Sequence, residues 1–369
     1  MAGSEAVVCV PVHNEEERLP RLCRALAEQV GLDGRPLAPE ALRVVFLLNN
    51  CSDRSRQAAD AAAARHGSLA IEIVDVVLPP HAAHVGTARR MAMNIGARTF
   101  HRAGIPCGAL LATDADAIPA SDWVAANLAA LAEGADVVGG ALSHLPDEEA
   151  RLPDAVRLRG RRLRNYRAAL DTLEAAIDPL PYDPAPRHWD HTGASLAIAA
   201  ATYRRVGGLP PLRCREDLAL VAAVRRAGGR VRHCPAVRVQ VSARLAGRAA
   251  GGMAHTLSAW ADAARRGTPV LVEDPAASEA RFRSRAALRS LFAAHRDGRS
   301  NATDELAAQI GLAPRAMERA VRHAVSEGAL LETLVPEPAD PPATMPLAGA
   351  LAAIEARLRL VRGNPHGAT

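Results

Sequence analysis

The first residues with a clear chemical use are two aspartates, Asp114 and Asp116, separated by one alanine. They follow the apolar run 108–113, which is typical of a buried strand. Two carboxylates at a strand end can point toward one place, and they suit a hard cation such as Mg²⁺ or Mn²⁺ that also takes phosphate oxygens. The alternative is a turn in which both aspartates accept hydrogen bonds from nearby backbone. The position directly after a strand favours the metal interpretation.

A second acidic pair, Glu216 and Asp217, begins the helical pattern that continues to residue 227. A carboxylate at a helix start can serve as a general base toward a hydroxyl group. The alternative is a purely structural role, in which both acids only stabilise the positive end of the helix dipole.

Other polar residues follow predicted strands or lie on a predicted helix. Asn14 and Asp53 come after the strand patterns 6–12 and 42–48, where they could also cap the following helices. Arg89 and Arg90 lie on the predicted helix 86–101. Their guanidinium groups could form charge-assisted hydrogen bonds to a diphosphate, or they could belong to a solvated helix face.

The elements that must position these residues alternate along the first half of the chain. Strand patterns at 6–12, 42–48, 70–78, 108–113 and 135–139 are separated by helical patterns. This alternation predicts a parallel α/β sheet covered on both faces, and ligands of such sheets bind beyond the carboxyl ends of the strands. The polar clusters fall at those ends.

Composition narrows the class of protein. The 369 residues are 49% hydrophobic and 23% charged, which is ordinary for a globular protein and excludes general disorder. All 45 basic residues are arginines, and the net charge is +5. Aromatic residues make up only 3%, which argues against a platform for stacking single-stranded nucleic acid. The six cysteines never form a C-x-x-C pair, so neither a zinc site nor a disulfide framework is indicated.

Taken in order, several segments resemble the motifs of the family 2 glycosyltransferases, which have the GT-A fold. The resemblance covers about residues 5–255, and the combination of motifs is specific although no single motif is. The matching segments are 7–16, 49–53, 86–96, 114–116, 191–195, 207–209, 216–217 and 241–244 with Arg248. The fold implied is a Rossmann-like mixed sheet flanked by helices, followed here by a C-terminal helical extension.

The resemblance also implies a role for each matched residue. It places Pro11, Asn14, Glu15, Asn49, Asp53, Arg89, Arg90 and Asp114 at the donor nucleotide, Asp114 and Asp116 at a divalent metal, Gly193, Glu216, Arg244 and Arg248 at the acceptor or diphosphate, and Asp217 as the catalytic base. Asn49 stands where the family usually has an aspartate that reads the base. Its amide oxygen can still accept an N–H of a base.

The activity implied is that of a hexosyltransferase-type enzyme. It would move a sugar from a nucleotide-sugar donor, with a UDP-sugar expected, to a hydroxyl of a small molecule, lipid or glycan. Inverting transfer needs only one base, and a Mg²⁺ or Mn²⁺ cofactor would stabilise the leaving diphosphate.

We expect three segments along the chain. Residues 1–274 form the GT-A domain, residues 275–335 a separable helical extension, and residues 336–369 a proline-rich, partly mobile segment with a terminal helix. No apolar run reaches the ~18–20 residues of a membrane span, and no basic region precedes the first apolar run. We therefore expect a cytoplasmic protein. The arginine-rich stretch 157–167 reads as a solvated helix face, with contact to a membrane surface left open.

Two other functions compete with this interpretation. Residues 301–312 and 316–324 resemble a helix-turn-helix or winged helix, which would make the chain a DNA-binding regulator. Acidic Asp304, Glu305 and Glu318 lie nearby, so we expect no nucleic-acid partner. A sugar nucleotidyltransferase would need a glycine-rich phosphate loop after the first strand, where residues 11–15 read Pro-Val-His-Asn-Glu.

Overall fold

The computed structural model describes residues 5–67, 69–105, 107–245, 247, 252–299, 304–338 and 342–363. The chain divides into two compact units that do not follow chain order. The first unit comprises residues 1–152, 190–224 and 230–259, and the second comprises residues 153–189, 225–229 and 260–369. Within the described residues, no helix combines the length and the apolar character that crossing a bilayer requires.

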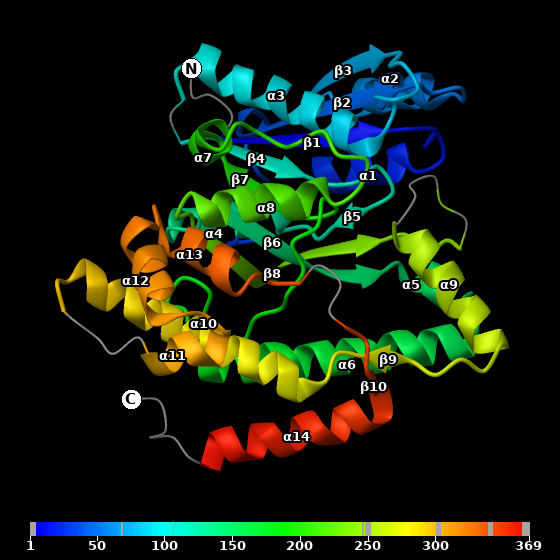
Figure 1. Ribbon diagram of the computed structural model, residues 1–369. Helices are drawn as coiled ribbons and strands as arrows, with labels where there is room; N and C mark the ends of the chain where they lie inside the picture. Colours follow the sequence, from blue (N-terminus) through cyan, green and yellow to red (C-terminus); the bar gives the residue numbers. More distant parts are fainter. Residues whose placement is uncertain are drawn as a thin grey trace. The chain divides into compact units, whose positions relative to one another are not determined.

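The first unit contains the alternating elements that the sequence predicts (Figure 1). In chain order they are β1 (Ala6–Val12), α1 (Leu19–Ala27), the 3₁₀ turn η1 (Pro39–Ala41), β2 (Leu42–Asn49), α2 (Ser55–Arg65), β3 (Ala70–Val76), α3 (Val85–Ala103), β4 (Ala109–Ala112), β5 (Ile118–Pro119), α4 (Trp123–Ala132), β6 (Val137–His144), α5 (Pro146–Glu149), β7 (Leu196–Ala199), α7 (Ala200–Arg205), α8 (Glu216–Arg226), β8 (Val231–Val241) and α9 (Met253–Arg265).

The described strands of this unit form one eight-stranded sheet in the order β3-β2-β1-β4-β7-β6-β8-β5. The neighbouring pairs β3–β2, β2–β1 and β1–β4 are parallel, as the alternation predicts. Strand β7 is antiparallel to both β4 and β6, and β5 is antiparallel to β8. The mixed sheet flanked by helices that the resemblance implies is therefore confirmed. An all-parallel sheet is wrong because β7 follows the long insertion after β6 instead of a short βα unit.

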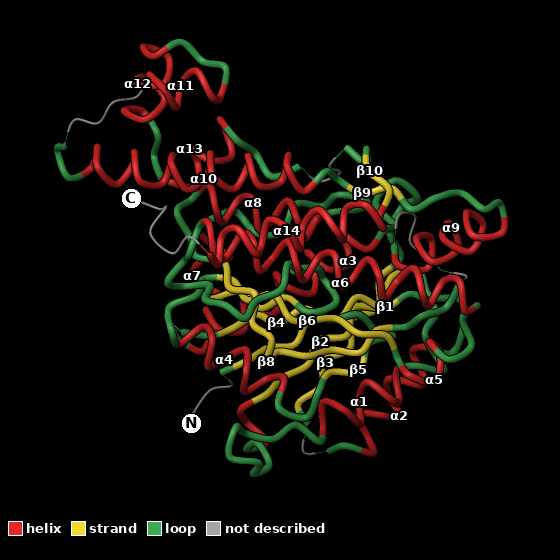
Figure 2. The backbone as a smooth tube through the Cα atoms, turned by 90° about the horizontal axis from the view of Figure 1, so that it is seen from below, coloured by secondary structure: helices red, strands yellow, loops and turns green. Residues whose placement is uncertain are grey.

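Both faces of the sheet are covered by helices, as Figure 2 shows. Along β1, the side chains of Val8 and Val10 pack with α1, α2 and α4, whereas those of Val7 and Cys9 pack with α3 and α8. Successive strand residues point to opposite faces, so a strand buried on both faces must be apolar throughout. All seven residues of β1 are buried, which explains why the strand has no charged or strongly polar residue.

Helix α3 carries an arginine onto the face that packs against the sheet. Its buried side chains include Ala88, Arg89, Ala92 and Met93, which share one face by helical spacing. The helix ends at Gly104, whose φ of 65° is the left-handed conformation that favours glycine at a C-terminus. A guanidinium group on the apolar face of a helix requires charged or polar partners.

The second unit consists mainly of helices around two small cores. Its elements are α6 (Asp154–Ile177), β9 (Leu271–Val272), α10 (Pro275–Arg296), α11 (Asp304–Ile310), α12 (Pro314–His323), α13 (Glu327–Leu334), β10 (Met345–Pro346) and α14 (Leu347–Gly363). One core joins Tyr166 of α6 with Phe282 of α10 and Ile354 of α14. The other joins α10 with α11, α12 and α13 through residues such as Leu288 and Met317. The division at residues 274 and 335 stays a prediction about which segments fold separately.

Candidate active site

The two aspartates of the D-x-D motif lie directly after β4, in the first unit. In the turn after β4, Ala115 and Ala117 are buried in the core, whereas Asp114 and Asp116 keep part of their side chains exposed. The side chain of Asp114 is 36% exposed and that of Asp116 is 18% exposed. Burial, and then the nearby charge of Asp114, raise the pKa of Asp116 to about 6. The two carboxylates therefore repel one another, and a cation placed between them would relieve this repulsion.

Arg89 connects the D-x-D motif to the start of α8. One terminal nitrogen, Nη2, donates to Asp114 Oδ1 at 2.5 Å, and the other, Nη1, donates to the Glu216 carboxylate. The side chain is only 4% exposed. Burial alone would lower the pKa of Arg89, but Asp114, Glu216 and Asp217 outweigh it and the pKa is raised. Arg89 is thus charged and holds two acidic motifs, far apart in sequence, at one site.

Asp217 is held by backbone groups. Its Oδ2 accepts the Gly193 N–H at 2.7 Å, and its Oδ1 accepts the Leu218 N–H at 2.8 Å. A carboxylate has about four acceptor positions, so each oxygen keeps room for a further hydrogen bond. Burial raises the pKa of the adjacent Glu216, against the opposing effect of Arg89. The orientation of Asp217 is therefore fixed by the loop before β7 and by its own helix.

Gly193 is required by the position of Arg89. A Cβ added at Gly193 would lie 2.3 Å from Cζ of Arg89, far inside contact distance. We expect Gly193→Ala to displace the guanidinium group from Asp114 and Glu216 and to lower turnover by about 100-fold, as small misplacements in active sites do. Steady-state kinetics would measure this. Gly67→Ala is the matched control, because a Cβ at Gly67 meets nothing within 4 Å. Wild-type turnover in the Gly193 variant would contradict a role for Arg89 in holding the site.

A second arginine, Arg244, holds the other aspartate. Its Nη2 lies 3.0 Å from Asp116 Oδ2 and 2.9 Å from Glu15 Oε1, and its Nη1 donates to Glu15 Oε2 at 3.3 Å. These carboxylates raise the pKa of Arg244 despite its burial. Arg244 follows β8 and Glu15 follows β1, so this ion-pair cluster joins two strand ends to the D-x-D motif.

Glu148 of α5 anchors the chain beside Arg244. Its Oε2 accepts hydrogen bonds from Ser242 Oγ at 2.7 Å and from the Ala243 N–H at 2.8 Å. Its Oε1 accepts from Arg18 at 2.8 Å. These donors lower the pKa of Glu148 although burial opposes them. Glu148 therefore fixes the two residues before Arg244.

The ends of β1 and β2 are joined by side-chain hydrogen bonds. Asn14, with a φ of 56° in the left-handed region, accepts the Ser52 N–H at 2.7 Å and the Asp53 N–H at 3.3 Å. Asp53 accepts the Glu16 N–H at 3.2 Å and the Ser55 N–H at 2.9 Å. The capping role considered for Asn14 and Asp53 is not seen, because the N-caps of α1 and α2 are Arg18 and Arg54, neither with a side-chain cap. Asn14 and Asp53 instead join the two loops to one another.

The remaining predicted site residues differ in their surroundings. Pro11 is buried on β1, two residues beyond the last β1–β4 pair, Cys9 with Ala112. Asn49 is 4% exposed, and its Oδ1 has no hydrogen-bond partner among the described residues. Arg90 donates to the carbonyl of Leu209 at 2.9 Å. Arg248 lies outside the described residues.

The carboxylate oxygens of Asp114 and Asp116 are suitable ligands for a divalent cation. Among the described residues, no group of three or more His, Cys, Asp or Glu side chains surrounds a common point. A cation here would take the two carboxylates and complete its shell with phosphate oxygens and water, as Mg²⁺ commonly does. His191 and His233 bond to one another, with 3.0 Å between Nδ1 and Nε2.

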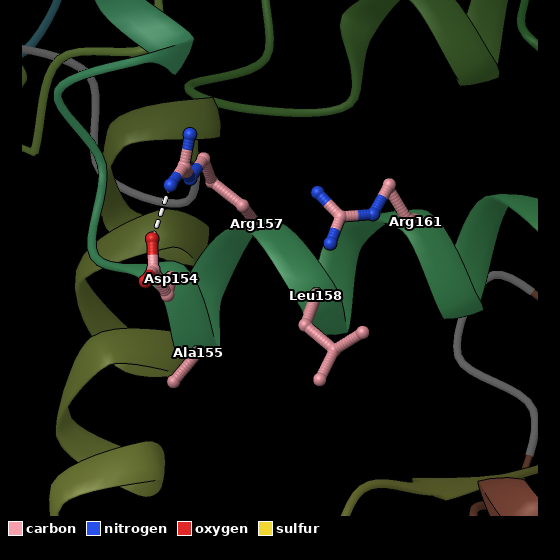
Figure 3. A pocket seen from close by; sticks show the side chains of 5 residues that line it. All are labelled: Asp154, Ala155, Arg157, Leu158 and Arg161. Carbon is pink, nitrogen blue, oxygen red and sulfur yellow. Dashed lines mark hydrogen bonds and ion pairs between the residues drawn. The ribbon is translucent and has the colours of Figure 1, made fainter.

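An open pocket of about 360 Å³ lies on α6 in the second unit (Figure 3). It is lined by Asp154, Ala155, Arg157, Leu158 and Arg161. None of the residues predicted for sugar transfer lines this pocket, so the pocket and the cluster at Asp114 share no residue.

Comparison with known proteins gives a family. Residues 7–176 match the sequence model described as Glycosyl transferase family 2, and no curated protein matches the chain. The matched segment contains β1 to β6 and the D-x-D motif. This part of the chain belongs to glycosyl transferase family 2, and the enzyme is a glycosyltransferase.

Solved structures with a similar chain are also glycosyltransferases. The mannosyltransferase PcManGT from Pyrobaculum calidifontis, in complex with GDP-Man and Mn²⁺, is 18% identical with a TM-score of 0.45, covering 99% of this chain and 88% of that one. S. aureus TarS 1-349 in complex with UDP is 13% identical with a TM-score of 0.45, covering 98% and 90%. Glucosyl-3-phosphoglycerate synthase from Mycobacterium tuberculosis, with Mn²⁺, UDP and phosphoglyceric acid, is 18% identical with a TM-score of 0.40, covering 73% and 82%.

Proposed function

We propose that this glycosyltransferase uses a UDP-sugar and a divalent metal, and that it inverts the configuration of the transferred hexose. The observation that carries the proposal is the Arg89 bridge, which brings the D-x-D carboxylate Asp114 to the acidic pair at the start of α8. A donor-side cation site and a general base are the two groups that metal-dependent inverting transfer uses. The acceptor is a molecule with a free hydroxyl.

The donor side is assigned to the ends of β1, β2 and β4. Asp114 and Asp116 would hold Mg²⁺ or Mn²⁺, which when bound neutralises the charge of the leaving diphosphate. Arg244 lies against Asp116 and Glu15, where its guanidinium group can also donate to phosphate oxygens. Residues Pro11, Asn14 and Asp53 would line the nucleoside pocket.

The acceptor side is assigned to the start of α8 and the loop before β7. Asp217 would take the proton of the attacking hydroxyl, and the backbone hydrogen bonds from Gly193 and Leu218 would keep its carboxylate in place. Glu216 is engaged by Arg89, so its role would be to position that arginine.

The side chain of Asn49 indicates which nucleobase the donor carries. Its buried Oδ1 is an acceptor that has no described partner, so it suits a base that presents an N–H. Uracil and guanine present a ring N–H at the corresponding position, whereas adenine and cytosine present a bare nitrogen. This favours a uridine or guanosine diphosphate donor.

The test is a thermal-shift screen of UDP, GDP, ADP and CDP and their sugar conjugates, each with Mg²⁺, with Mn²⁺ and with chelator. A ligand at about 100 times its dissociation constant should stabilise the fold by about 2.7 kcal/mol. We expect the uridine compounds to give the largest shift, and only with metal. A metal-independent shift, or a preference for adenosine compounds, would contradict the proposal.

Arg244 should compete with the metal for Asp116. We expect Arg244→Gln to bind Mn²⁺ about tenfold more tightly in the absence of nucleotide, since a positive charge next to the cation is removed. The same variant should bind the donor nucleotide more weakly, because a phosphate contact is lost. Mn²⁺ titration by electron paramagnetic resonance measures the first effect. Arg238→Gln is the control, because Arg238 pairs with the surface residue Asp122. Equal Mn²⁺ affinity would rule out competition.

A further inference from the structure

Helix α6 in the second unit is strongly basic, and sugar transfer as proposed does not use it. Between Asp154 and Asp171 the chain contains six arginines and no acidic residue. They are Arg157, Arg159, Arg161, Arg162, Arg164 and Arg167. Several are three or four positions apart, a spacing at which like charges destabilise a helix. This density of charge lowers helix stability unless an anionic partner compensates it.

The helix has one buried side and one exposed side. Tyr166, Leu170 and Leu173 are buried against α10 and α14. Arg161, Arg162 and Arg164 are exposed, and Leu158 among them is 41% exposed. We call these four residues, with Arg157, the basic face of α6. It combines positive charge with an exposed apolar side chain.

Two arginines of the basic face, Arg161 and Arg162, form no hydrogen bond or close ion pair with a residue that the structure describes. Arg161 has only a longer-range attraction to Asp154. Arg157 pairs with Asp154, at the N-terminal end of the helix. Figure 3 shows Arg157 and Arg161, one turn apart, with their guanidinium groups on the same side of α6 beside the open pocket. Two neighbouring guanidinium groups at an open pocket suit a phosphate group.

The exposed surroundings favour a lipid surface over a nucleic acid. The aromatic residue of α6, Tyr166, is buried and cannot stack on a base. Trp189 is 46% exposed, and the Arg167 guanidinium group lies 4.2 Å from its ring centre. Exposed leucine and tryptophan beside arginines are the side chains that enter the headgroup region of a bilayer.

We propose that the basic face of α6 binds the surface of a bilayer that contains anionic phospholipids. The arginines contact lipid phosphates, and Leu158 enters the boundary between headgroups and acyl chains. Each arginine near an anionic surface adds about 1 kcal/mol. Membrane binding of this kind is independent of the donor and metal assigned above, so it can be tested on the enzyme without substrate.

The test uses the full chain and vesicles of phosphatidylcholine with or without phosphatidylserine, measured by co-sedimentation. The wild type should bind only the anionic vesicles and dissociate when salt rises from ~0.1 M to ~1 M, where the Debye length falls to about 3 Å. The triple variant Arg161→Gln, Arg162→Gln and Arg164→Gln should bind about 100-fold more weakly. All three side chains are exposed, and circular dichroism with a thermal melt would verify that the variant is folded.

A charge-matched control separates the basic face from net charge. Arg35, Arg56 and Arg299 are exposed arginines that pair with Asp33, Asp60 and Asp297. Replacing all three by glutamine removes the same charge and should leave vesicle binding unchanged. An equal loss in both triple variants, or binding to neutral vesicles that the α6 variant retains, would overturn the proposal. So would binding to DNA or RNA that depends on the α6 arginines, without binding to vesicles.

Discussion

Replacing Asp116 by alanine should abolish sugar transfer and the metal-dependent part of nucleotide binding. Asp116 is one of two carboxylates placed to hold a divalent cation, and a Lewis acid at a leaving diphosphate contributes several kcal/mol to catalysis. We expect turnover to fall by at least about 1,000-fold, equivalent to about 4 kcal/mol. Calorimetric titration of nucleotide with Mn²⁺ and with chelator would measure the binding effect.

Loss of activity in this variant should not result from unfolding. The pKa of Asp116 is raised to about 6 in the fold, above its ordinary value, so ionisation at neutral pH costs folded-state stability. A neutral residue removes that cost at pH values above about 6, and the unfolding midpoint at pH 7 should not fall. Asp122→Ala is the control, because Asp122 lies between β5 and α4, outside the D-x-D motif, and pairs with Arg238 at the surface. Wild-type activity in excess chelator would exclude the metal role.

Much of the fold could be predicted because its signals are local. The apolar run 6–12 is β1, with the predicted bounds, because a strand buried on both faces has to be apolar throughout. The position of Asp114 and Asp116 at a strand end follows from the run before them. Strand β7 could not be predicted as antiparallel, because its direction depends on the path of the long insertion before it.

Sequence patterns could not predict which side chains contact one another in the site. The role of Arg89 at the diphosphate stays a prediction. In the structure Arg89 lies between Asp114 and Glu216, and its pairing with Glu216 spans 127 positions. One signal was available: Arg89 shares a helix face with Ala88, Ala92 and Met93, which predicts burial and therefore paired charge. For Arg244, nothing local indicates Glu15 as a partner, 229 positions away. Such pairs arise only when the sheet brings its strand ends together.

Asp217→Asn should lower turnover by at least about 100-fold while leaving donor affinity nearly unchanged. A positioned general base contributes about 10²–10⁴-fold to a rate. Asparagine preserves the shape of the side chain but cannot take the proton of the acceptor hydroxyl. Because Arg89 binds Asp114 and Glu216, replacement of Asp217 should leave the donor-side carboxylates in place.

The asparagine variant also changes the backbone contacts. Asp217 accepts N–H groups from Gly193 and from Leu218, and an amide has only one oxygen to offer them. One N–H therefore loses its acceptor, which costs about 1–3 kcal/mol of stability if it stays buried. Thermal unfolding should show this loss. The chemical role is separated from it by the pH dependence of kcat/KM, since loss of the base removes the acidic limb of the profile and a structural change does not.

The stereochemistry of the product decides what the Asp217 variant can mean, so it should be determined first. A donor with an α-linked sugar should give a β-linked product, observable by nuclear magnetic resonance, because attack by a hydroxyl activated by one base occurs opposite the leaving diphosphate. A retained configuration would remove the single-base mechanism. With inversion shown, Glu216→Gln is the informative partner variant: it disturbs Arg89 and should weaken donor and metal binding. If Asp217→Asn also loses donor binding, Asp217 belongs to the donor site and is not the base.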